Sequence, residues 1–141
     1  MSSSRMFVLP DVLSSTACGR FRAAIDRSAL SPAAILVDEC RVDTAVRQTL
    51  EADVDAETIA EVETILAAVR PRVASFFSIP LVGAEGPGFL RYRAGGFYAR
   101  HCDILESEED AFPRRISVVL FLTTASTADR YGTCDGGSLR V

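Results

Sequence analysis

The chain of 141 residues contains no lysine, no tryptophan and no asparagine, so all fifteen basic residues are arginines. The absence of lysine excludes Schiff-base chemistry and the lysine of a phosphate-binding P-loop. Any buried anion must therefore be held by arginine, backbone or hydroxyl groups. Histidine is nearly absent too, since His101 is the only one. A Ser-His-Asp triad would have to use this residue, and no G-x-S-x-G motif accompanies it, which argues against a hydrolase.

The sequence also lacks an excess of positive charge. Its net charge of −4 and its pI near 5.0 argue against a nucleic-acid partner or an anionic membrane. With 48% hydrophobic and 24% charged residues, the composition is that of an ordinary soluble globular protein. The length suits one hydrophobic core, so we expect residues 1–141 to form a single domain.

Long hydrophobic segments and closely paired cysteines are missing as well. The apolar run at residues 6–9 is too short for a signal peptide or a membrane span, which favours a cytoplasmic protein. None of the cysteines forms a C-x-x-C pair, so neither a zinc knuckle nor a redox motif is indicated. We expect reduced core thiols at Cys18, Cys40, Cys102 and Cys134.

The first half of the chain has the periodicity of helices. Cys18, Phe21 and Ile25 fall on one face of a helix that one of the hydroxyl residues at positions 14–16 can cap. This helix should end at Ser31-Pro32. Residues 34–42 are apolar with β-branched members and fit a short strand, whereas residues 43–54 fit a strand or a loop.

A longer helix is predicted to begin near Asp55. Acidic residues near its start suit the helix dipole, and apolar residues repeat at three- and four-residue steps. These are Ile59, Val62, Ile65, Leu66, Val69, Val73 and Phe76. Pro71 should kink the helix or divide it in two, and Pro80 should close it. Residues 83–88 should form a loop.

After Gly88 the pattern changes to that of strands. We expect strands over residues 89–92 and 97–103, joined by a turn or bulge at residues 94–96, and then an acidic loop over residues 107–113. The near-continuous apolar run at residues 115–123 fits a central strand buried on both faces. A turn at Asp135-Gly136-Gly137 precedes a further strand at residues 138–141. Helices followed by antiparallel strands indicate an α+β fold, with residues 1–80 mainly helical and residues 89–141 mainly strands.

His101 and Asp103 form the sharpest chemical signal. In an extended strand, alternate side chains share a face, so these two would point the same way and Cys102 would point away. One nitrogen and one oxygen donor on the same face suit two corners of a first-row metal site, as in the 2-His-1-carboxylate facial triad. By itself H-x-D is a weak signal, and the alternative is that His101 is an ordinary structural histidine.

The residues around His101 and Asp103 strengthen the interpretation of this pair as metal ligands, because three motifs follow one another in the order found in a known family. They are Tyr92-x-x-Gly95-Gly96-Phe97-Tyr98-x-x-His101-x-Asp103, the run Arg115–Leu122, and Gly136-Gly137-x-Leu139-Arg140-Val141. This order resembles the prolyl 4-hydroxylase-type, iron(II)- and 2-oxoglutarate-dependent dioxygenases. The resemblance covers residues 89–141 in detail, and the preceding helical region fits the family's N-terminal support loosely.

The resemblance implies a double-stranded β-helix, or jelly roll, with the N-terminal helices packed on one sheet. It implies that His101 and Asp103 are iron(II) ligands and that Tyr92, with Tyr98 less firmly, lines the 2-oxoglutarate pocket. Leu139 would pack near the cosubstrate, and Phe121 stands where some relatives carry a tyrosine. The implied reaction hydroxylates an unactivated C–H bond of a small-molecule or peptide substrate with dioxygen, releasing succinate and CO₂. Ascorbate commonly keeps the iron reduced.

The sequence departs from the family at its end. The family's third metal ligand is a later histidine, and an Arg or Lys beyond it pairs with the far carboxylate of 2-oxoglutarate. Both follow the Gly-Gly-x-Leu strand, but the sequence stops at Val141. We therefore expect an incomplete barrel that needs about 40 to 60 further residues, and little activity from this chain alone.

Two classes of function remain open from the sequence. The first is the dioxygenase, represented by the N-terminal part of its catalytic domain. The second is a truncated or degenerate non-catalytic relative that serves in binding or assembly. In both, open strand edges favour self-association. Tyr92 and Tyr98 fit a core role as well as a site role, and Cys102 and Cys134 fit inert thiols better than metal ligands.

Overall fold

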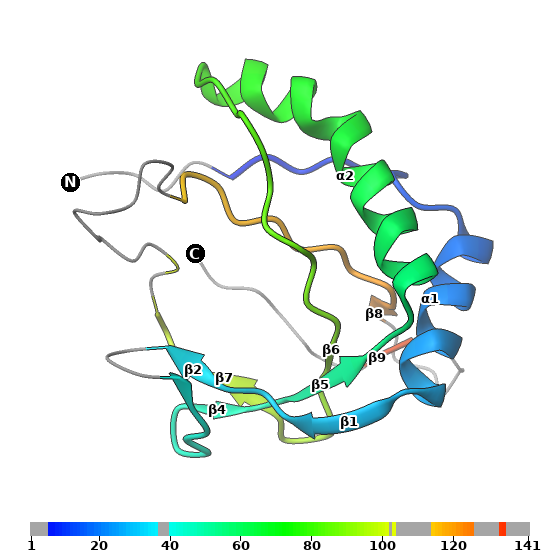
Figure 1. Cartoon of the computed structure of the whole chain (residues 1–141), viewed down its shortest axis with the longest axis vertical. Helices are drawn as coiled ribbons and strands as arrows, with labels where there is room; N and C mark the ends of the chain where they lie inside the picture. The colour runs from blue at the N-terminus through cyan, green and yellow to red at the C-terminus, as the bar shows by residue number, and fades with distance from the viewer. Residues whose placement is uncertain (1–5, 37–39, 102, 104–113, 126–132, 135–141) are drawn as a thin grey trace.

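Two helices and several short strands make up the described part of the protein. The computed structural model describes residues 6–36, 40–101, 103, 114–125 and 133–134. Helix α1 (Ser15–Arg27) and helix α2 (Ala56–Phe77) lie on the same side of the molecule, and the main sheet lies next to α1 and the N-terminal end of α2 (Figure 1). Two helices with mainly antiparallel strands make the architecture α+β. The strands of the described residues form no closed barrel.

The main sheet is antiparallel and has the order β1-β5-β6. It contains β1 (Ala29–Pro32), β5 (Leu50–Asp53) and β6 (Leu90–Arg91). Three pairs of strands accompany it: β2 (Ile35–Leu36) with β3 (Cys40–Arg41), β4 (Arg47–Gln48) with β7 (Phe97–Tyr98), and β8 (Thr124–Ala125) with β9 (Thr133–Cys134). The first two pairs are antiparallel and the last is parallel. The region expected to be mainly helical therefore also carries β1 to β5.

Both helices begin where the sequence predicts, at Ser14, one of the three predicted capping residues, and at Asp55, the predicted start of the longer helix. Ser14 accepts a hydrogen bond from the N–H of Ala17 at 3.1 Å, and Asp55 accepts one from the N–H of Thr58 at 2.8 Å. The second bond lowers the pKa of Asp55 below its ordinary value, because it stabilises the charged carboxylate. Helix α2 ends at Ser78, which adopts the left-handed conformation with φ 56°.

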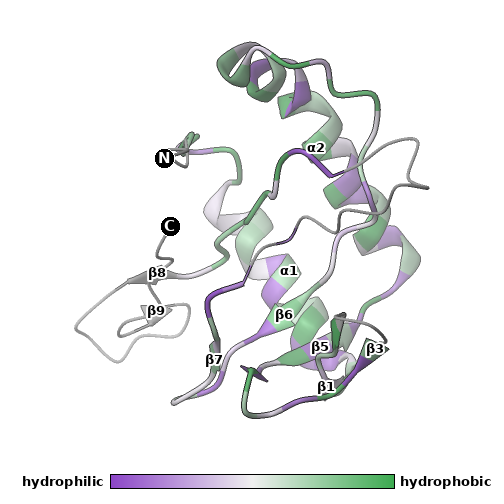
Figure 2. Cartoon of the chain, turned by 90° about the vertical axis from the view of Figure 1, so that its left-hand side faces the viewer, coloured by the Kyte–Doolittle hydropathy of each residue, from purple (hydrophilic) through white to green (hydrophobic). Residues whose placement is uncertain are grey.

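Pro71 lies inside α2, which continues through it as one helix. The alternative of two separate helices is therefore wrong. A proline removes one ladder hydrogen bond, and Pro71 is exposed, so water can solvate the carbonyl group that loses its partner. The C-terminal turns of α2 extend away from the sheet, and hydrophilic and hydrophobic residues interleave along the helix (Figures 1 and 2).

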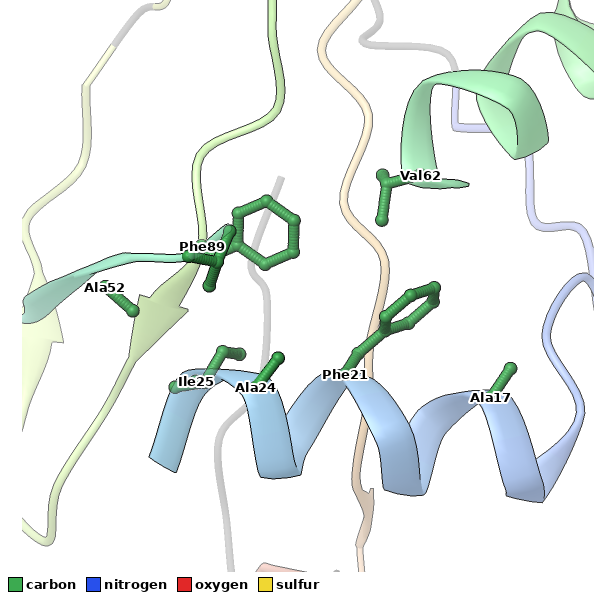
Figure 3. Packing of buried hydrophobic residues seen from close by; sticks show 8 residues of the cluster. Ala17, Phe21, Ala24, Ile25, Ala52, Val62 and Phe89 are labelled. Carbon is green, nitrogen blue, oxygen red and sulfur yellow. The ribbon is translucent and has the colours of Figure 1, made fainter. Parts of the chain in front are cut away.

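The hydrophobic core lies between α1, the N-terminal half of α2 and the main sheet. Phe21 points from α1 towards Val62 of α2, while Phe89 and Ala52 approach from the sheet (Figure 3). Phe21 is only 2% exposed and is the largest fully buried side chain in the described part of the chain. This core packs α1, β5 and the segment leading into β6 together, and only Thr49 separates β5 from β4 of the strand pair β4-β7.

The prediction of a central strand over residues 115–123 is wrong for the described structure. This run has no helix or strand assignment up to Thr123, and Val118 and Val119 are 53% and 55% exposed. Leu120 and Leu122 pack against the core, while the guanidinium of Arg22 donates to the main-chain oxygen of Leu122 at 2.5 Å. An apolar run becomes a central strand only when strands pair with it on both sides, and no described strand pairs with residues 115–122.

Several sequence predictions fall outside the described residues. They concern Cys102, the acidic loop over residues 107–113, the Gly136-Gly137 turn and the strand containing Leu139. Cys18 is half-buried as a free thiol, but Cys40 is exposed on β3, so the expectation of a core thiol is wrong there. None of the helices in the described part of the chain has the length and apolar character to cross a membrane.

Candidate functional site

The candidate site begins with the pairing of β4 and β7. Arg47 lies opposite Tyr98 in this antiparallel ladder. Directly opposite side chains share a face and lie close together, so the guanidinium of Arg47 stands over the ring of Tyr98 at 4.5 Å from its centroid. The same guanidinium donates a hydrogen bond to the main-chain oxygen of Ala34 at 2.7 Å. Tyr98 is thus positioned by the pairing of its own strand β7 with β4 and by the guanidinium of Arg47 on β4.

The turn before β7 depends on its glycines, as the sequence predicts. Gly95 has a positive φ of 78°, and the N–H of Gly96 donates to the main-chain oxygen of Arg93 at 2.8 Å. A β-carbon on Gly96 would lie 2.8 Å from the main-chain oxygen of Gln48, which is closer than real β-carbon contacts. The absence of a side chain at Gly96 therefore allows β7 to approach β4.

Strand β7 ends before His101, so the predicted strand over residues 97–103 is too long. The N–H of Ala99 still donates to the main-chain oxygen of Val46 at 2.8 Å. Residues 44–46 form a turn, however, so β4 offers β7 no further partner beyond this point. The chain then bends at Arg100. Strand alternation therefore does not explain how His101 and Asp103 come together.

The two predicted metal ligands nevertheless meet. Nε2 of His101 lies 3.0 Å from Oδ1 of Asp103. The imidazole stacks on the ring of Tyr98 with 3.6 Å between ring centroids and 17° between planes. The side chains of His101 and Asp103 are 35% and 46% exposed, so a solvent-borne ligand or ion can reach both.

A backbone contact determines which imidazole nitrogen carries a proton. Nδ1 of His101 lies 2.8 Å from the main-chain oxygen of Ala99. A carbonyl oxygen only accepts hydrogen bonds, so Nδ1 donates and carries the proton. Nε2 then faces the carboxylate of Asp103. Two lone pairs at 3.0 Å repel, so the contact suits a proton shared by the two atoms or a cation bound by both.

The spacing of Nε2 and Oδ1 suits a metal ion. Two ligands at adjacent corners of an octahedron, each about 2.1 Å from the ion, lie about 3.0 Å apart. The observed separation of 3.0 Å equals this edge. A histidine ligand that donates its other N–H to a backbone carbonyl is also the usual arrangement in metal sites. The donor set of His101 and Asp103 is therefore compatible with a first-row divalent ion.

Two further residues hold Asp103 from the segment that follows. The hydroxyl of Ser117 donates to Oδ2 of Asp103 at 2.5 Å. Nη1 of Arg114 lies 3.4 Å from the main-chain oxygen of Asp103, and the same guanidinium pairs with Glu85, with Nη2 donating to Oε2 at 2.6 Å. The hydrogen bond from Arg114 lowers the pKa of Glu85 below its ordinary range. The segment that carries Arg114 and Ser117 thus contacts Asp103 at two points, and Arg114 links this segment to Glu85.

The sequence did not predict the roles of Arg47, Glu85, Arg114 or Ser117. Ser117 did carry a signal, because it is the one polar residue in the apolar run 116–122. Arg47 carried none, since its position over Tyr98 follows from the register between strands about 50 residues apart. Tyr92 follows β6 and is 51% exposed, and Leu139 lies outside the described residues.

The order of the polar groups argues against a hydrolytic triad. In such a triad the imidazole stands between the serine hydroxyl and the carboxylate, so that it can remove the serine proton. Here the carboxylate of Asp103 stands between Ser117 and His101. In the part of the chain that the structure describes, no group of three or more His, Cys, Asp or Glu side chains is placed to hold a metal ion. Among the described residues, the site therefore brings together two candidate ligands, His101 and Asp103.

Comparison of the chain with protein-family models, with curated proteins and with solved structures finds no match.

Proposed function

We propose that the protein is an iron(II)- and 2-oxoglutarate-dependent dioxygenase in which His101 and Asp103 hold the metal ion. The observation that carries this proposal is the contact of 3.0 Å between Nε2 and Oδ1, with Nδ1 donating to the main-chain oxygen of Ala99. This tautomer leaves Nε2 as the metal-binding nitrogen. The order of the tyrosine, Gly-Gly turn, histidine and aspartate in the sequence supports the same family.

Bound iron(II) would supply the coordination of 2-oxoglutarate and the activation of dioxygen for C–H hydroxylation. The residues of this chain would orient the ion. Tyr98 supports the imidazole plane by stacking, and Ala99 fixes the tautomer. We assign Tyr92 and Leu139, together with Tyr98, to the 2-oxoglutarate pocket. Ascorbate would keep the metal reduced, and a small molecule or peptide would be the substrate.

The double-stranded β-helix is part of this proposal. The antiparallel sheet β1-β5-β6 and the pair β4-β7 would belong to its first strands, and α1 would pack outside. We also propose a cytoplasmic protein, and its net charge of −4 and pI near 5.0 support a role without a nucleic-acid or anionic-membrane partner.

The test is titration of the full chain with iron(II) in the absence of oxygen, followed by 2-oxoglutarate. We expect binding of iron(II) that His101→Ala and Asp103→Asn weaken. We also expect 2-oxoglutarate to bind the iron-loaded chain and not the metal-free chain, because it chelates through the ion. Unchanged iron binding in both variants would contradict the proposal.

A second candidate is a non-catalytic binding or assembly protein. The observation that favours it is the exposed apolar side of residues 116–122, where Val118, Val119 and Phe121 are 53%, 55% and 59% exposed. Exposed apolar residues in a segment that pairs with no described strand favour association with another chain. In this case the contact between His101 and Asp103 would be a structural ion pair.

A further inference from the structure

Ser117 occupies an unusual chemical position. It is the one polar residue between Ile116 and Leu122, and its hydroxyl donates to Oδ2 of Asp103 at 2.5 Å. Hydrogen bonds from a hydroxyl to an ionised carboxylate are typically this short, and they are stronger than hydrogen bonds between neutral groups. Ser117 therefore makes a strong, direct contact with one of the two proposed metal ligands.

The contact leaves the two carboxylate oxygens with different roles. Oδ2 accepts from Ser117, while Oδ1 faces Nε2 of His101 at 3.0 Å. Without the hydroxyl, the carboxylate group could rotate about its terminal bond and exchange the two oxygens, since this torsion is soft. The serine thus selects one oxygen for the imidazole side.

The segment that carries Ser117 is itself anchored. Arg114, three residues earlier, reaches the main-chain oxygen of Asp103 at 3.4 Å and forms a two-point ion pair with Glu85. Leu120, three residues after Ser117, packs against the hydrophobic core. The hydroxyl of Ser117 therefore lies on a segment that is fixed by contacts both before and after this residue. A hydrogen bond that positions a metal ligand needs such a fixed donor.

We propose that Ser117 is a positioning residue that holds Asp103 as a monodentate ligand, with Oδ1 directed at the metal. This inference rests on the proposed function of His101 and Asp103. Residues that orient metal ligands by hydrogen bonds typically contribute about 10- to 100-fold to metal affinity. Ser117 contributes to the affinity and the geometry of the site without touching the ion.

The experiment measures binding of Mn(II) to the full chain by the electron paramagnetic resonance signal of free Mn(II). The variants are Ser117→Ala, Ser117→Thr and His101→Ala, with Ser75→Ala as a matched control at an exposed position of α2. We expect Ser117→Ala to weaken binding about 10- to 100-fold and Ser117→Thr, which keeps the hydroxyl, to bind like the wild type. Ser75→Ala should leave the affinity unchanged.

Thermal unfolding of the metal-free variants separates positioning from folding. Ser117→Ala can lower both the stability of the chain and its affinity for Mn(II). In that case, wild-type affinity in Ser117→Thr supports the inference. An affinity of Ser117→Thr as low as that of Ser117→Ala overturns it. If Ser117→Ala binds Mn(II) as tightly as the wild type while His101→Ala binds more weakly, the positioning role of Ser117 is overturned and the proposed metal site is not. Binding by His101→Ala equal to that of the wild type would overturn the proposed metal site and this inference with it.

Discussion

Truncation of Phe21 should destabilise the protein more than truncation of an exposed aromatic residue. Phe21 is 2% exposed, and replacement of a buried phenylalanine by alanine typically destabilises by about 3–5 kcal/mol. Its neighbours Ala17, Ala24 and Ala52 are too small to fill the cavity, so we expect about 4 kcal/mol for Phe21→Ala. With an unfolding entropy of about 2.1 cal/mol/K per residue, this corresponds to a decrease in Tm of about 13 °C.

The matched control is Phe121→Ala. Phe121 is 59% exposed, and substitutions at such positions usually change stability by less than about 0.5 kcal/mol. Urea unfolding followed by circular dichroism, together with thermal unfolding, measures both variants. A loss of stability in Phe121→Ala similar to that in Phe21→Ala would refute the described packing. It would show that residues 116–122 form the buried strand that the sequence predicts.

Two further predictions concern the start of α2 and the apolar run. The pKa of Asp55 lies below its ordinary value of 3.8, so its contribution to stability is present above pH 3.8 and is lost as the pH falls through the lower folded-state pKa. Urea unfolding at several pH values should therefore show a steeper loss of stability at low pH for the wild type than for Asp55→Asn, and parallel curves would contradict this assignment. In sedimentation experiments, the wild type should form dimers or larger species that Val119→Arg dissociates. Val82→Arg, at a position 75% exposed in another segment, should not affect association, and a monomeric wild type would exclude association through this run.

The two helices could be predicted because their signals are local. Hydrophobic residues at helical spacing indicated Phe21 and Val62 as core residues, and Ser14 and Asp55 precede the helices as capping residues. The turn at Gly95 could be predicted for the same reason. Each of these features depends on residues only a few positions apart, so the sequence pattern is sufficient.

The strands were harder to predict because their pairing is not local. The apolar run 115–123 has the composition of a buried strand, but the described structure gives it no strand partner and leaves Val119 exposed. Strand β7 ends early because its partner β4 follows a turn at residues 44–46. Nothing near residue 97 in the sequence indicates where that turn lies.

The site was predicted in part. The H-x-D spacing correctly identified His101 and Asp103 as neighbours in space, although a bend and not a continuous strand brings them together. The contact of Asp103 with Ser117 and the stacking of Tyr98 between segments depend on tertiary structure. Such contacts join residues whose spacing in the sequence follows no fixed rule, so the motif alone did not indicate them.

The most direct test of the proposed metal site is calorimetric titration of the full chain with iron(II) in the absence of oxygen. The wild type should bind one equivalent, and both variants should bind more weakly, because His101→Ala removes one of the two donors that lie 3.0 Å apart and Asp103→Asn replaces the charged carboxylate with a neutral amide. Absence of binding to the wild type, or binding by both variants as tight as that of the wild type, would show that the contact between His101 and Asp103 is an ion pair and not a metal site.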